Sequence, residues 1–159
     1  MGSFGFKPHD HSSCISTGVS EVAKRCEAAG LQFTPVRKRV LEILLEGHRA
    51  IGAYEILDKL REEGLGSQPP VAYRALDFLV KHRFAHKIEK LNAFIACTHP
   101  GDMHAPAFLI CRSCDAVEEA LTAGEDGRLD KAAQETGFTI ERTVLEAEGV
   151  CPNCQGKSE

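Results

Sequence analysis

The sequence contains no apolar run of the length, about 20 residues, that is needed to span a membrane. Its N-terminal stretch from Met1 to Cys14 is polar and carries histidines, so it lacks the apolar core of a signal peptide. Internal repeats and low-complexity tracts are also missing. These absences argue against a membrane partner and predict a cytoplasmic protein whose cysteines stay reduced.

The chain has no excess of positive charge either, because 19 Lys and Arg residues stand against 23 Asp and Glu residues, for a net charge of −4. At first sight this balance disfavours a nucleic-acid partner. The two halves differ, however. Residues 1–86 carry 12 basic and 10 acidic residues, for +2, whereas residues 87–159 carry 7 and 13, for −6. The basic groups are therefore concentrated in the first half, and their position on the fold decides whether DNA can bind.

The first half has the pattern of four helices followed by a hairpin. After a polar stretch predicted to be a mobile arm (residues 1–17), apolar residues recur at helical spacing in four segments. These segments are residues 19–29, 35–44, 53–63 and 71–82. Alternating strands over 84–88 and 93–97 then flank a turn at Lys90. This order predicts a winged helix-turn-helix DNA-binding domain over residues 18–96.

The fourth helical segment is the candidate reader of DNA. Pro69 and Pro70 begin it, and its apolar stripe consists of Ala72, Ala75, Leu76 and Leu79. The opposite side of this helix carries Tyr73, Arg74, Asp77 and Lys81, which we expect to point outward.

The second half follows a different pattern. A connector over residues 97–106 is the expected hinge, and strands are predicted over 107–110, 116–121 and 138–146. A helix is predicted over 127–136, before Gly137. A unit of this size buries only a small apolar core, so a bound metal ion and dimerisation would add to its stability. The predicted fold class is therefore α+β: a winged-helix domain, then a small α/β dimerisation domain over residues 107–159.

Two CxxC pairs in the second half predict a structural zinc site. Cys111 and Cys114 form one pair, Cys151 and Cys154 form the other, and 36 residues separate the two pairs. Each pair closes a tight turn that directs two thiolates to one point, and two such turns complete a tetrahedron. The alternatives are buried cysteines or a redox dithiol. With four protein ligands no position is left for a substrate, so the expected role is structural.

A second set of metal-ligating residues surrounds the hinge. His86 and Cys97 lie at either end of the hairpin, His104 lies in the connector and Glu119 lies in the second half. Each has an ordinary alternative, such as a buried thiol, a solvated histidine or a surface carboxylate. Together they offer nitrogen, sulfur and oxygen atoms, a combination that suits zinc better than magnesium or calcium.

Several segments resemble the ferric uptake regulator family, and within it the zinc uptake regulator branch. The stretch Gln68-Pro-Pro-Val-Ala-Tyr-Arg-Ala-Leu-Asp-Phe-Leu resembles the family's recognition helix, and Phe33-Thr-Pro-Val-Arg and the two CxxC pairs also match. Phe84-Ala-His-Lys-Ile and Val144-Leu-Glu-Ala-Glu-Gly-Val-Cys resemble the zinc branch. Val71 departs from the threonine that is usual after the two prolines, so a capping or phosphate contact is in doubt.

The resemblance implies a homodimeric, zinc-dependent repressor of zinc-uptake genes that binds palindromic operator DNA, with no small-molecule substrate. It implies two zinc ions per chain, one structural and one regulatory, the latter bound by His86, Cys97, His104 and Glu119. Among outward residues, Arg74 can contact guanine through two hydrogen bonds, and Tyr73 a thymine methyl group or a phosphate. Further candidates for DNA contact are Tyr54, Arg37, Arg39 and Lys81, although Arg39 and Lys81 fit an ordinary solvated surface nearly as well.

Other interpretations stay open at this stage. The same family could sense iron or manganese, or the chain could be a zinc-stapled protein-interaction module. An enzyme with Cys97 as nucleophile is disfavoured, because no oxyanion or substrate motif accompanies it. His99 could compete with His104 as a ligand. Cys14, His9 and His11 could form a weak additional metal site or belong to a disordered arm.

Overall fold

The computed structural model of the chain describes residues 10–47, 49–66, 68–98, 100, 106–121, 127–141 and 143–157. Its elements follow in the order α1 (His11–Ala29), α2 (Pro35–Leu45), α3 (Ala53–Glu62), α4 (Pro69–Lys81), β1 (Ala85–Ile88), β2 (Ala93–Ala96), β3 (Pro106–Cys111), β4 (Val117–Leu121), α5 (Arg128–Thr136) and β5 (Leu145–Gly149). Helices thus precede a separate sheet, which confirms the predicted α+β class. Among the described helices, none is long and apolar enough to cross a bilayer.

Helix α1 begins earlier than predicted. It starts at His11 and not at Val19, so residues 11–17, which were predicted to belong to a mobile arm, are helical. The reason is an N-cap: the Asp10 carboxylate accepts a hydrogen bond of 2.9 Å from the backbone N–H of Ser12. Gly18 lets α1 approach α2 closely, because a Cβ atom there would lie 2.8 Å from a methyl carbon of Leu45.

Helices α2, α3 and α4 pack around one apolar core. Thr34 caps α2 by accepting a hydrogen bond of 3.3 Å from the N–H of Arg37, and Pro35 occupies the first turn. Helix α4 buries its predicted apolar stripe, Ala72, Ala75, Leu76 and Leu79. Tyr73 and Arg74 on the opposite side of the helix are exposed. The amphipathic pattern therefore leaves a polar face of α4 open to a partner.

The antiparallel hairpin β1–β2, called the wing below, follows α4. Its register pairs Ala85 with Ala96 and Ile88 with Ala93, and Asn92 closes the turn with a φ of 47°. The connector between α2 and α3 extends the wing, because Ile51 and Phe94 exchange backbone hydrogen bonds of 2.8 and 2.9 Å. The wing is thus tied to the helices that precede it.

The second sheet has the strand order β4-β3-β5. Strand β3 pairs antiparallel with β4 and parallel with β5. Strand β5 begins at Leu145 and not at Phe138 as the alternation predicted, because its pairing with β3 starts where Leu145 lies opposite Ala107. Residues 138–141 and 143–144 are not in a strand, and Phe138 is 68% exposed.

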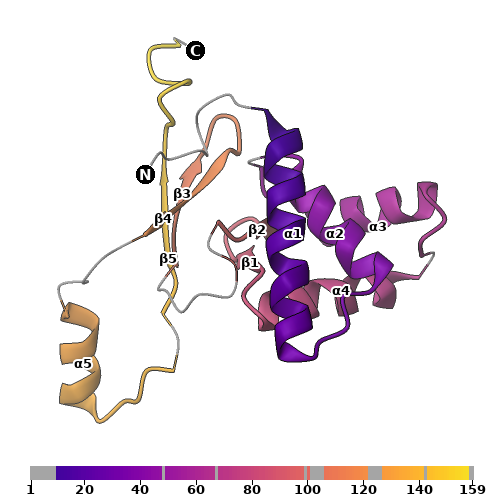
Figure 1. The fold of residues 1–159 in the computed structure, drawn as a ribbon. Coiled ribbons are helices and arrows are strands. Elements are labelled where there is room, and N and C mark those ends of the chain that lie inside the picture. The colour runs from indigo at the N-terminus through magenta and orange to yellow at the C-terminus, as the bar shows by residue number, and fades with distance from the viewer. Residues whose placement is uncertain are drawn as a thin grey trace.

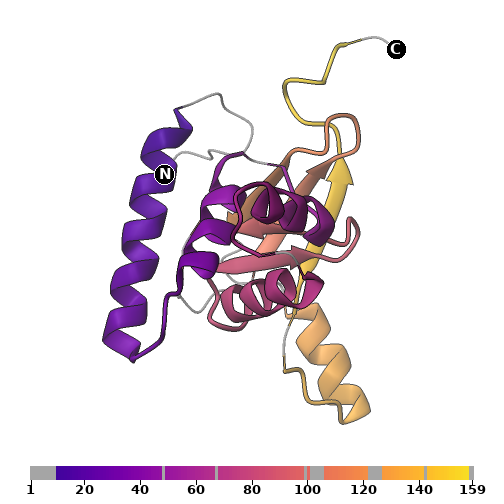
Figure 2. The same ribbon diagram turned by 90° about the vertical axis from the view of Figure 1, so that its right-hand side faces the viewer.

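The wing lies between the helices and this sheet (Figures 1 and 2). We call residues 10–98 the helical half and residues 106–157 the sheet half. A second apolar cluster joins them, in which Ile88 and Ile95 of the wing contact Phe108, Ile110 and Val117 of the sheet. A backbone bridge between Arg49 and Ala116 adds to this contact. The position of the wing therefore fixes how α4 is oriented relative to the sheet.

Helix α5 stands apart from the remainder of the chain in both views (Figures 1 and 2). Only Ala133 of this helix is buried, and Leu129 is 55% exposed. Large apolar side chains on the sheet half are also exposed, including Leu109 and Leu145. An apolar surface of this kind is typical of a protein–protein interface.

We expect Ile88→Ala to lower the free energy of unfolding by about 2–5 kcal/mol, because Ile88 is fully buried and its replacement leaves a cavity between the two halves. Urea denaturation followed by circular dichroism measures the change. Lys87→Ala, at the neighbouring exposed position, is the matched control and should stay within about 0.5 kcal/mol of the wild type. Equal stability of Ile88→Ala and the control would show that the wing does not need this packing.

Candidate metal centres and DNA-reading helix

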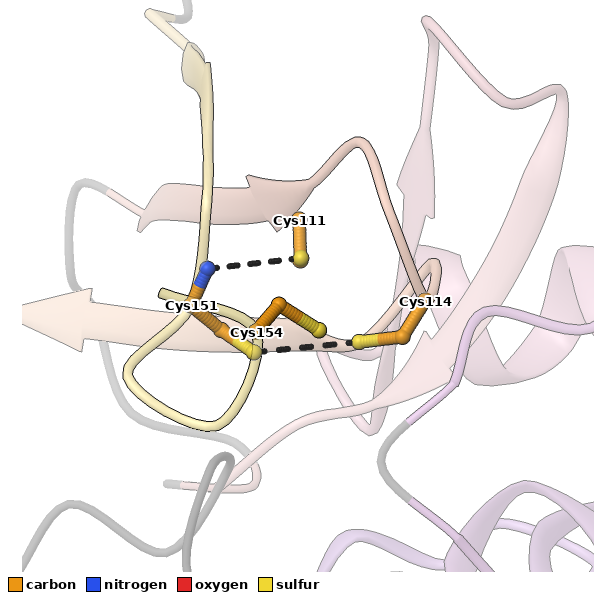
Figure 3. Close-up of side chains that lie close together, drawn as sticks. All are labelled: Cys111, Cys114, Cys151 and Cys154. Carbon is orange, nitrogen blue, oxygen red and sulfur yellow. Dashed lines mark hydrogen bonds between the residues drawn. The ribbon is translucent and has the colours of Figure 1, made fainter. Parts of the chain in front are cut away.

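The four cysteines of the CxxC pairs converge in the sheet half (Figure 3). Their sulfur atoms all lie within 4.8 Å of one another, and those of Cys114 and Cys151 are 3.8 Å apart. Zinc–sulfur bonds of about 2.3 Å in a tetrahedron require sulfur atoms about 3.8 Å apart. The observed spacing therefore fits a zinc ion bound by Cys111, Cys114, Cys151 and Cys154.

Backbone hydrogen bonds position these cysteines and favour the thiolate form of Cys111. Cys111 and Cys151 are buried, and the N–H of Cys151 points at the Cys111 sulfur over 3.3 Å. Backbone hydrogen bonds, with that from Cys151 the largest, lower the pKa of Cys111 to about 6, which favours the thiolate that zinc binds, whereas hydrogen bonding with the Cys151 thiol raises the pKa of Cys154. Tight turns position each pair, with the N–H of Asp115 bonded to the Cys111 carbonyl and that of Cys154 to the Cys151 carbonyl, both at 2.9 Å.

A second cluster lies between the two halves of the chain. His86 of β1, Cys97 after β2 and Glu119 of β4 offer ligand atoms that all lie within 4.8 Å of one another. Glu119 Oε1 is 3.2 Å from His86 Nε2 and 3.8 Å from Cys97 Sγ. The Glu119 side chain has no exposed surface and that of His86 is 13% exposed. A carboxylate buried in this way needs compensating partners, and a cation is the strongest of them.

Two neighbours that the sequence analysis did not identify support this cluster. The N–H and hydroxyl of Thr98 donate to Glu119 Oε2 at 3.0 and 3.2 Å, which leaves Oε1 directed at His86 and Cys97. The ring of Phe108 packs on His86 with the centroids 5.3 Å apart. Such outer contacts fix the orientation of metal ligands. The position of Thr98 next to Cys97 was the only signal of its role in the sequence.

The structure thus brings together three of the four residues predicted to bind the second metal. His104 lies outside the described residues, as do His9 and His99. The side chain of His11 is also not described. Cys14 lies on α1, remote in sequence from both clusters. Among the residues that the structure describes, these two groups of side chains are the ones whose ligand atoms lie close enough together to bind a metal ion.

Helix α4 presents the residues predicted to read DNA. Tyr73 is 44% exposed, and Arg74 and Lys81 are exposed as well. Tyr54, in the first turn of α3, is 73% exposed. Gln68 precedes α4 without a side-chain capping hydrogen bond. Pro69 and Pro70 have no backbone N–H, and the N–H of Val71 donates to the Gln68 carbonyl at 3.1 Å, so these first three residues leave no free N–H for an anion.

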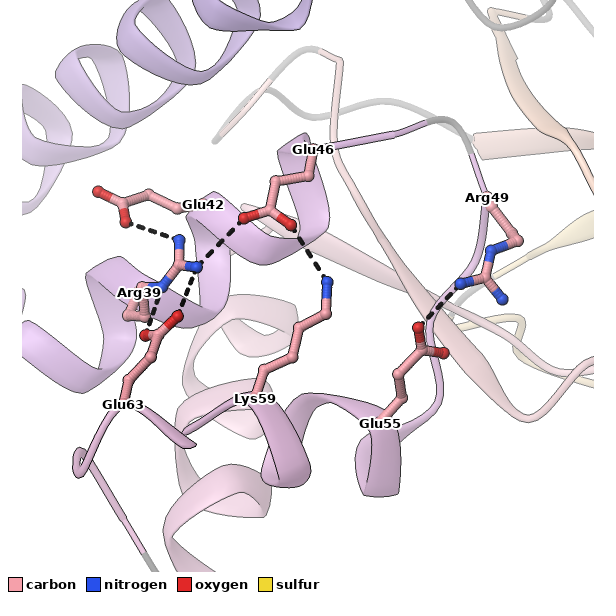
Figure 4. A network of polar contacts seen from close by, with 7 residues as sticks. All are labelled: Arg39, Glu42, Glu46, Arg49, Glu55, Lys59 and Glu63. Atoms are coloured by element: carbon pink, nitrogen blue, oxygen red, sulfur yellow. Dashed lines mark hydrogen bonds and ion pairs between the residues drawn. The ribbon is translucent and has the colours of Figure 1, made fainter. Parts of the chain in front are cut away.

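Arg39 has a different environment from these residues (Figure 4). Its guanidinium contacts Glu63 through two hydrogen bonds of 2.7 Å and also contacts Glu42 and Glu46 at 3.2 Å. The hydrogen bonds that Arg39 donates to the Glu63 carboxylate raise the pKa of Arg39 and lower the pKa of Glu63. Lys59 joins the cluster through Glu46. Arg39 therefore ties α2 to the end of α3, and three carboxylates surround its charge.

Arg37 also packs within the helical half. Its guanidinium lies 3.8 Å from the centroid of the Phe78 ring, a cation–π contact, and donates to the backbone carbonyl of Gln32. Phe78 in turn lies against His82 and Phe84. Arg37 thus holds the start of α2 against α4.

Comparison with known proteins finds similarity to zinc uptake regulators, both in sequence and in structure. No family model matches the chain. The "Zinc uptake regulation protein" of Escherichia coli (strain K12) is 37% identical over 138 residues, which cover 86% of this chain and 80% of that protein. A solved structure of a zinc uptake regulator complexed with zinc and DNA has a TM-score of 0.82 and 35% identity, covering 88% of this chain and 94% of that one.

A third relative, XcZur, has been solved in two forms. Its holo form matches with a TM-score of 0.79 at 38% identity, over 87% of this chain and 96% of that chain. Its apo form, at the same 38% identity and over 88% and 97%, matches with a TM-score of only 0.51. Since the identity does not differ, the difference in TM-score reflects conformation.

We expect Cys151→Ser to remove about one zinc ion per chain and to lower the melting temperature by at least about 10 °C, because a tetrahedral site with three thiolates loses most of its affinity. Metal analysis by mass spectrometry and a thermal melt test this. The control Cys14→Ser changes a cysteine of α1 outside the cluster and should retain zinc and stability. Unchanged zinc content in Cys151→Ser would contradict the assignment.

Proposed function

The chain belongs to the ferric uptake regulator family, in its zinc uptake regulator branch, and we propose that it represses zinc-uptake genes by binding palindromic operator DNA when a regulatory zinc site is filled. It is a zinc-responsive transcription regulator and not an enzyme. The observation that carries the proposal is the convergence of His86, Cys97 and Glu119 from the two halves.

Each of the two clusters has its own role in this proposal. The four cysteines lie within the sheet half, where Cys111 ends β3 and Cys151 follows β5, so they would staple that half. His86, Cys97 and Glu119, with His104 as the expected fourth ligand, would hold a regulatory zinc. When bound there, the zinc would supply a cation between the wing and β4. The chain would thus bind two zinc ions.

The chemistry of the second cluster supports zinc over the alternatives within the family. The cluster offers a thiolate and an imidazole besides one carboxylate. Thiolate ligands favour zinc, whereas manganese and magnesium sites are built from carboxylate, carbonyl and water oxygens. A manganese-sensing member of the family is therefore the weaker alternative. An iron-sensing member is weaker because the identity is 37% to the zinc uptake regulation protein and 28% to a ferric uptake regulation protein.

The wing transmits the state of this site to α4. His86 lies on the wing and Cys97 directly follows it, and the wing is hydrogen-bonded through Phe94 to Ile51 in the connector between α2 and α3. Glu119 lies on β4 of the sheet half. Holding these three side chains together therefore fixes the angle between α4 and the sheet. The closer match to holo than to apo XcZur supports this, because the described arrangement has both halves docked.

A dimer would place two α4 helices on one duplex. Leu109 and Leu145 are exposed on the sheet half, as are Leu129 on α5 and Phe138 after it. A second copy that covers this apolar surface would produce a twofold axis and two reading helices. Operator half-sites about one helical turn apart fit such a dimer. The spacing between the two helices then depends on the angle at the wing in each chain.

The energy required for such a switch is modest. Moving a chain from 1:99 to 99:1 in favour of the docked form needs about 5.5 kcal/mol of differential binding. Apparent zinc-binding free energies of about 10–16 kcal/mol are known for structural sites, so part of such an energy suffices.

Among the predicted DNA contacts, we propose that Arg74 and Tyr73 contact base edges and that Tyr54, Lys81 and Arg37 contact the sugar–phosphate backbone. Arg39 lies between carboxylates and instead supports the packing of α2 on α3.

We expect Arg74→Ala to lower the affinity for operator DNA by about 10- to 100-fold, because an arginine that forms two hydrogen bonds to guanine discriminates by about 1–3 kcal/mol. Fluorescence anisotropy with an operator selected from a random pool by the zinc-loaded wild type measures this. The zinc content should stay unchanged. Lys131→Ala, which removes an exposed cation on α5, is the control. Equal loss for operator and random DNA would contradict base reading by Arg74.

We expect Glu119→Ala to abolish operator binding at zinc concentrations that saturate the wild type, while one tightly bound zinc per chain remains. In the wild type, operator DNA should tighten the exchangeable zinc by the factor by which zinc tightens operator binding, because linkage is reciprocal. Competition with a chelator, with and without operator, measures both affinities. If operator DNA leaves the zinc affinity unchanged, zinc does not act through the proposed switch. Zinc-independent DNA binding would favour another role for the chain, such as a zinc-stapled interaction module.

A further inference from the structure

The turn of the wing is held by a contact remote from both metal clusters. Glu146 of β5 accepts two hydrogen bonds from backbone N–H groups of the turn, at 2.6 Å from Glu89 and 3.1 Å from Lys90. Successive N–H groups in a turn form a concave site for an anion. Here the carboxylate of the sheet half occupies the anion site of the helical half.

Both partners in this contact are held in place by their own elements. Glu146 lies opposite Phe108 in the parallel pairing of β5 with β3, and Phe108 is 1% exposed. In the turn, the N–H of Asn92 bonds to the Glu89 carbonyl at 3.2 Å, which holds the N–H groups of Glu89 and Lys90 in position for Glu146. The contact therefore needs no ordering of a loose segment, and it breaks if the two halves separate.

The sheet half thus holds the wing at both ends. At one end, Glu119 of β4 contacts His86 and Cys97. At the turn, Glu146 of β5 contacts the backbone, and the cluster of Ile88, Ile95 and Phe108 lies between the two ends. Only the first end involves metal ligands. The second end can act whether or not a metal is bound.

We propose that Glu146 is a positioning residue that sets how much zinc the chain needs in order to bind its operator. This inference rests on the proposed function. The contact between Glu146 and the turn exists only in the docked arrangement, so it raises the docked fraction before zinc binds. Fewer chains are then undocked before zinc binds, so operator binding begins at a lower zinc concentration.

Glu148 offers a matched comparison on the same strand. Two residues further along β5, it points to the same side as Glu146 and pairs with Lys90 Nζ at 2.7 Å. Both side chains of this pair are more than two-fifths exposed, at 48% for Lys90 and 41% for Glu148. The hydrogen bonds of Glu146 are exposed as well, but their donors are backbone N–H groups held by the turn, whereas the Lys90–Glu148 pair must order two long side chains, which offsets most of its energy. The proposal therefore assigns the effect to Glu146 and not to Glu148.

The test is a zinc titration of operator binding in zinc-buffered solution for the wild type, Glu146→Ala, Glu146→Gln and Glu148→Gln. We expect Glu146→Ala to raise the zinc concentration at half-saturation about 10-fold or more, with the same operator affinity at saturating zinc. Glu146→Gln keeps one acceptor oxygen without the charge and should shift less. Glu148→Gln should match the wild type. An unchanged midpoint in Glu146→Ala would overturn the proposal. A lower plateau with an unchanged midpoint would also overturn it, because the wing would then contact DNA directly.

Amide hydrogen exchange on the zinc-depleted chain without DNA gives an independent readout. The N–H groups of Glu89 and Lys90 should exchange slowly in the wild type and about 10-fold faster in Glu146→Ala, while the core of α4 stays protected. Equal exchange in both proteins would overturn the proposal. A wild type that binds operator without responding to zinc would contradict the proposed function, and the exchange rates would still decide whether Glu146 holds the turn.

Discussion

The carboxylate of Glu119 is buried where the wing meets β4, and the other features of the proposed switch depend on how its charge is compensated. Thr98 donates two hydrogen bonds to one oxygen, and His86 and Cys97 face the other. All three of these partners belong to the helical half. Satisfying a buried carboxylate therefore also fixes the wing on the sheet, and α4 with it.

The two clusters of metal-ligating residues differ in what they connect. The four cysteines join the ends of β3 and β5 within one half, so filling that site changes the stability of the sheet more than its position. The cluster around Glu119 joins two halves that also meet through apolar side chains and through Glu146. A site between two bodies can convert binding energy into a change of orientation, whereas a site within one body cannot.

Features that depend on short sequence patterns could be predicted, whereas features that depend on contacts between residues far apart in the chain could not. The CxxC pairs, the Pro69-Pro70 start of α4 and its apolar stripe all follow from short spacings. The early start of α1 depends on one N-cap at Asp10, outside the apolar pattern. The late start of β5 depends on its register with β3. Of the three acidic partners of Arg39, Glu42 lies on α2, and Glu46 and Glu63 directly follow α2 and α3. Thr98 and Glu146 act on partners 21 and 57 residues away, which no periodicity reveals.

The central claim is that filling the site between the halves fixes the angle of α4. A spin label introduced at Glu62, an exposed position at the end of α3, would report the distance between the helical halves of a dimer by pulsed electron paramagnetic resonance. If filling this site fixes the angle of α4, the distance distribution without DNA is broad after removal of the exchangeable zinc and single and narrow at saturating zinc. The same narrow distribution in both states would contradict it.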